Sequence, residues 1–107
     1  MKQSKYRNVR TTTSDGITHD SRKEARRWSL LQLAEHAGTI TDLRRQVRYD
    51  LHVGGVKLWA YVADFVYVQD GETVVEDVKS PPTRANAVYR AKRKHMQLEY
   101  GITIREV

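Results

Sequence analysis

The chain has 107 residues, which is enough for one hydrophobic core and too few for two. Nineteen Lys and Arg against thirteen Asp and Glu leave a formal net charge of +6, a balance typical of proteins that bind polyanions. The absence of cysteine excludes disulfides and zinc–thiolate sites. Because no apolar run reaches membrane-spanning length and the N-terminus lacks the apolar core of a signal peptide, we expect a cytoplasmic protein with no membrane partner.

The N-terminal part differs in composition from the remainder. Residues 1–20 are polar and rich in threonine, which predicts an arm or loop with a turn at Ser14-Asp15-Gly16. Residues 21–107 are predicted to form a single domain. Its first element is a helix, because Ser21-Arg-Lys-Glu24 is a capping box and Gly38 is a natural stop.

Three strands are expected to follow this helix. The segment 47–53 alternates in the manner of a strand, Gly54-Gly55 turns it into a long second strand over 56–68, and a third strand runs from Thr73 towards Pro81-Pro82. The prolines end the third strand because they cannot donate to a ladder.

The C-terminal part predicts one more helix and one more strand. Thr83 can cap a helix from Arg84 to about Tyr100, which Gly101 stops, and 102–106 reads as a short strand. The order is αβββαβ. This order indicates an α/β fold with a mixed sheet flanked by helices.

A hairpin signal sets the register of the second and third strands. Asp70-Gly71 between two β-branched runs is typical of a type I′ turn, which needs positive φ at both central residues. If these two residues are the whole loop, Gln69 pairs with Glu72. Counting back then places Asp64 directly across from Asp77.

The face shared by these two acids is otherwise apolar, and we expect it to be buried. Like charges across a strand pair destabilise a sheet, and buried carboxylates require a cation. A divalent metal between Asp64 and Asp77, with Lys79 on the same face, is the simplest arrangement. The remaining members of the face are Leu58, Ala60, Val62, Val66, Val68 and Val75.

One spacing in the sequence resembles the bipartite signature of the PD-(D/E)XK nuclease superfamily. Asp64 is followed, after twelve residues, by Asp77-Val78-Lys79, and Ala63 stands in place of the usual proline. The chain is also similar to a family of small phage-borne proteins that carry this signature. More distantly, it resembles phage endonuclease I and other Holliday-junction resolvases. The likeness runs from about Tyr6 to the C-terminus, and its strand and helix order matches the order predicted from capping and turn signals.

The resemblance implies a Mg²⁺-dependent (or Mn²⁺-dependent) DNA endonuclease of phage or prophage type, acting in the bacterial host cytoplasm. It implies metal ligation by Asp64, Asp77, the carbonyl of Val78 and Glu24, with Lys79 orienting the attacking water. Related resolvases are homodimers and cut branched DNA, so a homodimer and a junction substrate are expected. Nicks, duplex ends and single strands remain alternative substrates, and a catalytically inactive nucleic-acid-binding module remains an alternative function.

Two acids have more than one interpretation. Glu24 is explained by the capping box, whereas the resemblance assigns it to catalysis as the helical acid ahead of the strands. Glu76 points to the opposite face together with Phe65, and it would replace Asp77 as the motif acid only if a β-bulge shifted the strand.

Cations cluster on the elements that flank the acids. Five of the thirteen acids fall between Asp64 and Asp77, so an acidic centre with basic surroundings is expected, as phosphate hydrolysis requires. A solvated charged surface is the alternative interpretation. The candidate nucleic-acid contacts are Arg22, Lys23, Arg26, Arg27, Arg44, Arg45, Arg84, Arg90, Arg93 and Lys94.

Overall fold

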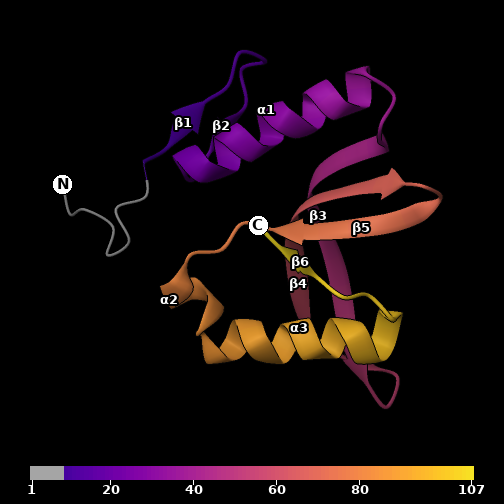
Figure 1. Cartoon of the computed structure of the whole chain (residues 1–107). Coiled ribbons are helices and arrows are strands. Elements are labelled where there is room, and N and C mark those ends of the chain that lie inside the picture. Colours follow the sequence, from indigo (N-terminus) through magenta and orange to yellow (C-terminus); the bar gives the residue numbers. More distant parts are fainter. Residues whose placement is uncertain (1–8) are drawn as a thin grey trace.

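The computed structural model describes residues 9–107 (Figure 1). The predicted αβββαβ order is present, with a short hairpin added before the first helix and a one-turn helix added before the last. This confirms the α/β class. The elements are β1 (Thr11–Thr12), β2 (Thr18–His19), α1 (Arg22–His36), β3 (Thr41–Val53), β4 (Val56–Gln69), β5 (Glu72–Asp77), α2 (Pro81–Arg84), α3 (Ala87–Tyr100) and β6 (Arg105–Glu106).

The N-terminal segment is more ordered than an arm. Strands β1 and β2 pair antiparallel around the predicted turn, in which the Gly16 N–H donates to the Thr13 carbonyl. The hairpin lies against α1 because Asp15 accepts hydrogen bonds from the Trp28 indole (2.7 Å) and the Gln32 amide (3.0 Å). The prediction of a loop is therefore wrong for Thr11–Thr12 and Thr18–His19, which are strands, whereas the turn between them lies at the predicted place. The prediction for residues 1–8 lies outside the described residues.

Helix α1 begins and ends where its sequence predicts. The Ser21 hydroxyl accepts from the Glu24 N–H at 3.1 Å, which satisfies one of the free donors of the first turn. Gly38 follows the helix with a φ of 80°, a left-handed conformation that glycine adopts without strain.

The main sheet has the order β3-β4-β5-β6, with β6 parallel to β5 and the other pairs antiparallel. Strand β3 begins at Thr41 rather than at residue 47. Asp42 and Gln46 both have positive φ, and the register shifts between Thr41 and Arg44. These irregularities and the basic residues between them hide the strand pattern in the sequence.

The β4–β5 hairpin has the predicted two-residue loop. Asp70 and Gly71 have φ values of 53° and 78°, and Gln69 pairs with Glu72. The ladder continues back to the pair Phe65 and Glu76. This places Asp64 and Asp77 next in register, as expected.

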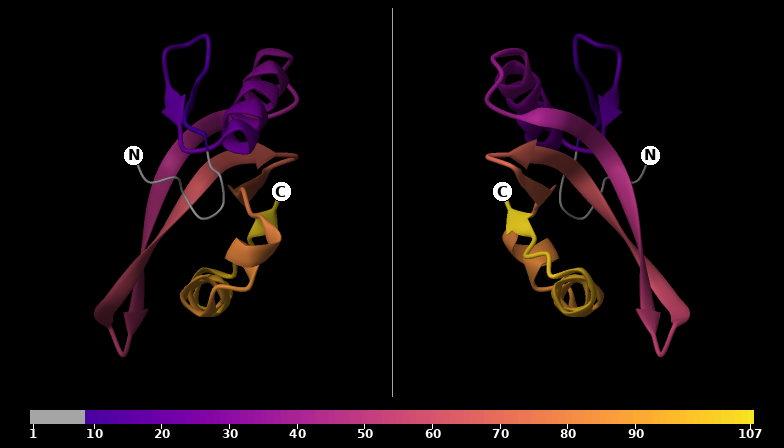
Figure 2. Two further views of the ribbon diagram at one scale, coloured as in Figure 1. Left: turned by 90° about the vertical axis from the view of Figure 1, so that its left-hand side faces the viewer. Right: turned by 90° about the vertical axis from the view of Figure 1, so that its right-hand side faces the viewer.

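Two hydrophobic clusters cover different parts of the curled sheet, with α1 and α3 on either side of β5 (Figures 1 and 2). The α1 cluster consists of Trp28, Leu31, Ile40, Phe65 and Tyr67. The α3 cluster consists of Leu51, Tyr61, Ala63, Val66, Val75, Tyr89, Met96 and Ile104. The two clusters meet at the middle of β4.

The predicted buried face of β4 is only partly correct. Val66 and Val75 are buried, and Ala60 and Val68 are half-buried, whereas Leu58 and Val62 are 60% and 46% exposed. Strand β5 pairs only with residues 65–69, so the other half of β4 extends past it in the β3–β4 ribbon (Figure 2). There α3 covers the opposite face, the one that carries Tyr61 and Ala63.

The segment after β5 also differs from the prediction. Pro81-Pro82 begins the one-turn helix α2, and Asn86 rather than Thr83 caps α3 by accepting from the Tyr89 N–H. Gly101 ends α3 with a φ of 68°. Residues 102–104 precede the short strand β6. Among residues 9–107, no helix has both the length and the apolar character needed to cross a membrane.

Candidate active site

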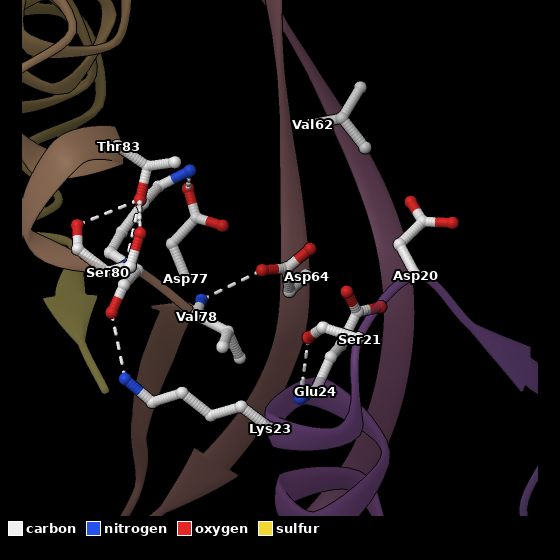
Figure 3. Close-up of a pocket in the computed structure, with 11 residues that line it drawn as sticks. Asp20, Ser21, Lys23, Glu24, Val62, Asp64, Asp77, Val78, Ser80 and Thr83 are labelled. Atoms are coloured by element: carbon white, nitrogen blue, oxygen red, sulfur yellow. Dashed lines mark hydrogen bonds and ion pairs between the residues drawn. The ribbon is translucent and has the colours of Figure 1, made fainter. Parts of the chain in front are cut away.

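A pocket of about 310 Å³ opens where the N-terminus of α1 faces the adjoining parts of β4 and β5 (Figure 3). All four predicted catalytic residues line it, although Glu24 and Lys79 lie far apart in the sequence. The lining residues are Asp20, Ser21, Lys23, Glu24, Val62, Asp64, Asp77, Val78, Lys79, Ser80 and Thr83.

The two strand acids are held in different ways. Asp64 Oδ2 accepts a hydrogen bond from the Val78 N–H at 2.8 Å. Asp77 Oδ2 accepts from the hydroxyl of Tyr61 at 2.7 Å and lies 3.3 Å from the ammonium of Lys79. Asp77 is 3% exposed, so its carboxylate is buried behind the more accessible Asp64.

The surroundings of Asp77 favour its neutral form in the absence of a metal. Burial, followed by the neighbouring Asp64 carboxylate, raises the pKa of Asp77, and the Tyr61 hydroxyl and Lys79 only partly oppose this. The same burial, with Asp77 beside the phenol, raises the pKa of Tyr61. Charging both carboxylates in this buried place is unfavourable, and a cation bound between them would offset that cost.

Glu24 is 7% exposed, and its side chain lies in the pocket (Figure 3). Only its backbone N–H takes part in the cap, so the helix cap and the site use different atoms of one residue. Burial, and then the charges of Asp64 and Asp20, raise the pKa of Glu24 to about 7. The imidazole Nδ1 of His19 lies 3.6 Å from Glu24 Oε1.

The oxygen donors of the pocket suit Mg²⁺ or Mn²⁺ better than softer metals. Asp64, Asp77 and the Val78 carbonyl would hold the ion. The Val78 N–H donates to Asp64, so the backbone just after β5 lies beside the carboxylates. Within residues 9–107, no three Asp, Glu or His side chains are close enough to enclose a cation as they stand. Glu24 lines the same pocket and could reach such an ion directly or through a water molecule.

Glu76 does not belong to this pocket. It pairs with Phe65 and is fully buried on the α1 side, as predicted for the opposite face. Its carboxylate accepts from Arg27 Nε at 2.8 Å and from Arg27 Nη2 at 2.5 Å, and also from the Tyr67 hydroxyl. The register of β4 and β5 is regular at Glu76, so Asp77 is the acid of this pair that lines the pocket.

The predicted basic contacts divide into two groups. Arg27 is half-buried and pairs with the buried carboxylate of Glu76, and Arg45 is half-buried beside Phe65. Arg93 is half-buried and pairs with Glu106 at 3.2 Å. The exposed members are Arg22, Lys23, Arg26, Arg44, Arg84, Arg90 and Lys94. Of these, Lys23 lines the pocket and donates to the Lys79 carbonyl at 2.8 Å.

Sequence reasoning missed three polar residues of the site. Asp20 and His19 come from the N-terminal hairpin, and Tyr61 holds Asp77 through its hydroxyl. Tyr61 is 4% exposed and belongs to the α3 cluster, so its hydroxyl reaches Asp77 from the core. Tyr61 alternates with Ala63 and not with Asp64, so no alternating pattern in the sequence pairs it with the acids.

The raised pKa values predict a stability that falls with pH in the metal-free protein. Asp77 and Glu24 have folded pKa values above their unfolded values, so their stabilising effect is present at low pH and lost as pH rises through the folded values. Between pH 6.5 and 8.5 we expect a loss of about 1–2 kcal/mol, or roughly 5–10 °C in Tm. Thermal melts in EDTA measure this.

The window from pH 6.5 to 8.5 covers the range in which both acids with raised pKa values lose their protons. His19 has a lowered pKa, caused mainly by burial, so its effect is confined to pH below its ordinary value of 6.5. Asp77→Asn should flatten the slope. A Tm that stays constant or rises across this window in the native protein would contradict the buried, mutually repelling pair.

The fold and the pocket define an α/β protein with a carboxylate–lysine site at the open end of the β4–β5 hairpin, opposite its turn. A family model described as "Protein of unknown function (DUF1064)" matches residues 3–105, and the chain belongs to this family. No curated protein and no solved structure matches the chain significantly.

Proposed function

We propose that this protein is a metal-dependent nuclease that hydrolyses phosphodiester bonds in DNA. The observation that carries the proposal is the convergence of Glu24, Asp64, Asp77 and Lys79 in one pocket from three separate elements. The resemblance to PD-(D/E)XK nucleases assigns roles to the same four residues. The alternative is that the acids serve only in structural salt bridges. That role would not require two adjacent carboxylates, each of which makes the ionisation of the other less favourable.

In this proposal, Asp64, Asp77 and the Val78 carbonyl hold Mg²⁺ or Mn²⁺. The ion, when bound, neutralises the phosphate and lowers the pKa of a water molecule. The Lys79 ammonium lies on the same side as Asp77 and would orient the attacking water or pair with a phosphate oxygen. The water oxygen would lose a proton to solvent and bond to phosphorus, the bond between phosphorus and the sugar oxygen would break, and the sugar oxygen would take up a proton from solvent.

The partner is proposed to be DNA, which the net charge of +6 and the exposed cations on α1, α2 and α3 support. A branched substrate and a homodimer follow from the resemblance alone. Strand β3 is an edge of the main sheet, so it has unpaired backbone groups that a second chain could use.

The direct experiment is incubation of supercoiled plasmid with the protein in Mn²⁺ and in EDTA, followed by a panel of junction, nicked, duplex-end and single-stranded substrates. Metal-dependent loss of at least one substrate is expected. No cleavage of any substrate would contradict a nuclease.

One observation favours a second candidate, the non-catalytic nucleic-acid-binding module. The part of the chain that the structure describes shows no complete three-residue cation cage. Binding of DNA without Mn²⁺ affinity and without cleavage would identify this alternative.

Binding to DNA in EDTA should weaken steeply with salt. Phosphate contacts release counterions, so about five contacts give a slope of roughly −4 to −5 in log K against log salt concentration. Arg26→Glu and Arg90→Glu, which change exposed residues of α1 and α3, should each reduce the slope by about 1. Mobility-shift titrations at several salt concentrations measure it. A flat dependence would contradict nucleic-acid binding as a whole.

A further inference from the structure

The imidazole of His19 has a buried nitrogen whose role the fold alone does not explain. His19 is 1% exposed, and its Nδ1 makes no hydrogen bond within residues 9–107. The other ring nitrogen, Nε2, lies 3.3 Å from Thr13 Oγ1. Buried polar groups ordinarily have partners, and Nδ1 lies 3.6 Å from the carboxylate of Glu24.

The N-terminal hairpin holds this ring at a fixed place relative to Glu24. Asp15, in the turn, is bonded to Trp28 and Gln32, both of which belong to the helix that carries Glu24. The ring of Trp28 lies beside that of His19, with centroids 6.1 Å apart. His19 and Glu24 therefore belong to one packed unit, although they come from a strand and a helix.

Glu24 lacks any other fixed partner for its carboxylate among the described hydrogen bonds and ion pairs. A carboxylate that binds a cation needs a fixed orientation. A hydrogen bond from a neighbouring side chain on the side away from the cation provides that orientation. The 3.6 Å between Glu24 Oε1 and His19 Nδ1 is only slightly longer than a hydrogen bond. A hydrogen bond between His19 Nδ1 and Glu24 Oε1 would have the same direction whether the nitrogen or the oxygen carries the hydrogen.

We propose that His19 is a positioning residue, whose Nδ1 directs the Glu24 carboxylate towards the cation of the pocket. The inference rests on the proposed function, because it requires a cation at Asp64 and Asp77. Groups of this kind typically change metal affinity by about 10- to 100-fold when they are removed.

Three substitutions separate the two ring nitrogens. His19→Asn keeps a polar atom one bond from Cγ, where Nδ1 lies, whereas His19→Gln keeps one a bond further out, near Nε2 and Thr13. His19→Leu removes both and keeps an apolar volume. Titration of Mn²⁺ by calorimetry should give a dissociation constant raised about 10- to 100-fold in the Gln and Leu variants. The Asn variant should remain within about 3-fold of the native protein.

Cleavage assays give a second measurement. In His19→Gln the Mn²⁺ concentration for half-maximal cleavage should rise, with the rate at saturating Mn²⁺ little changed. Thermal melts in EDTA control for folding, since the Asn and Gln variants each lose one polar contact of the ring. Equal Mn²⁺ affinities in all three variants, or affinities that follow Tm, would overturn the positioning role.

The native protein separates this inference from the proposed function. If it binds Mn²⁺ through Asp64 and Asp77 but the His19 variants bind equally well, only the positioning role fails. If it binds no Mn²⁺, the proposed function and the inference fail together.

Discussion

Asp64→Asn and Asp77→Asn should each reduce DNA cleavage by about 10²- to 10⁴-fold, the range typical for loss of a group that acts in the transition state. Each substitution removes a charged oxygen ligand while the side chain keeps its size. Plasmid cleavage in Mn²⁺ measures the effect. Asp70→Asn is a matched control, because Asp70 lies at the far end of the same hairpin and asparagine tolerates its positive φ.

The same two variants should fold as well as the native protein when no metal is present. Removing one charge relieves the repulsion between the acids, so the Tm in EDTA should hold or rise. A large loss of Tm in both variants, together with lost cleavage, would mean that the acids are structural partners. Cleavage at the native rate would exclude them from the site.

Arg27→Met should lower the free energy of unfolding by about 3–5 kcal/mol, the typical result of breaking a buried ion pair from one side. Glu76 is fully buried, and Arg27 supplies two of its hydrogen bonds. Without Arg27, the carboxylate keeps the Tyr67 hydroxyl and the more distant Arg105 guanidinium, 3.9 Å away. Denaturant unfolding measures the change.

The neighbouring residue provides the control for this second experiment. Arg26 is exposed on the same helix, so Arg26→Met should change stability by less than about 0.5 kcal/mol. Combining Arg27→Met with Glu76→Gln should recover part of the loss, because the second change removes the unpaired charge. Equal stabilities of Arg27→Met and Arg26→Met would show that the pair contributes little.

The central part of the fold could be predicted because local signals determine it. Asp70 and Gly71 dictate the turn and therefore the register that brings Asp64 beside Asp77. The caps at Ser21 and Gly101 likewise depend on residues within one turn of the helix ends. The approach of the two acids to Lys79 follows from the same register.

The remaining features depend on contacts between distant residues. The N-terminal hairpin is held by Asp15 bonding to α1, and no local pattern indicates this. The ion pair of Arg27 with Glu76 forms because Glu76 lies beneath α1, and only the packed structure shows this. The exposure of Leu58 follows from the short length of β5, because an alternating pattern indicates two faces but does not say which one a helix will cover.

The site lies at the junction of two separately packed halves. Glu24 lies on α1, the helix that contributes Trp28 to the α1 cluster, whereas Asp77 is hydrogen-bonded to Tyr61 of the α3 cluster. The Lys23 side chain, bonded to the Lys79 carbonyl, spans the gap between them. The distance between the acids is therefore set by the relative placement of two hydrophobic cores. Loosening either core changes the geometry of the pocket without altering any residue that lines it.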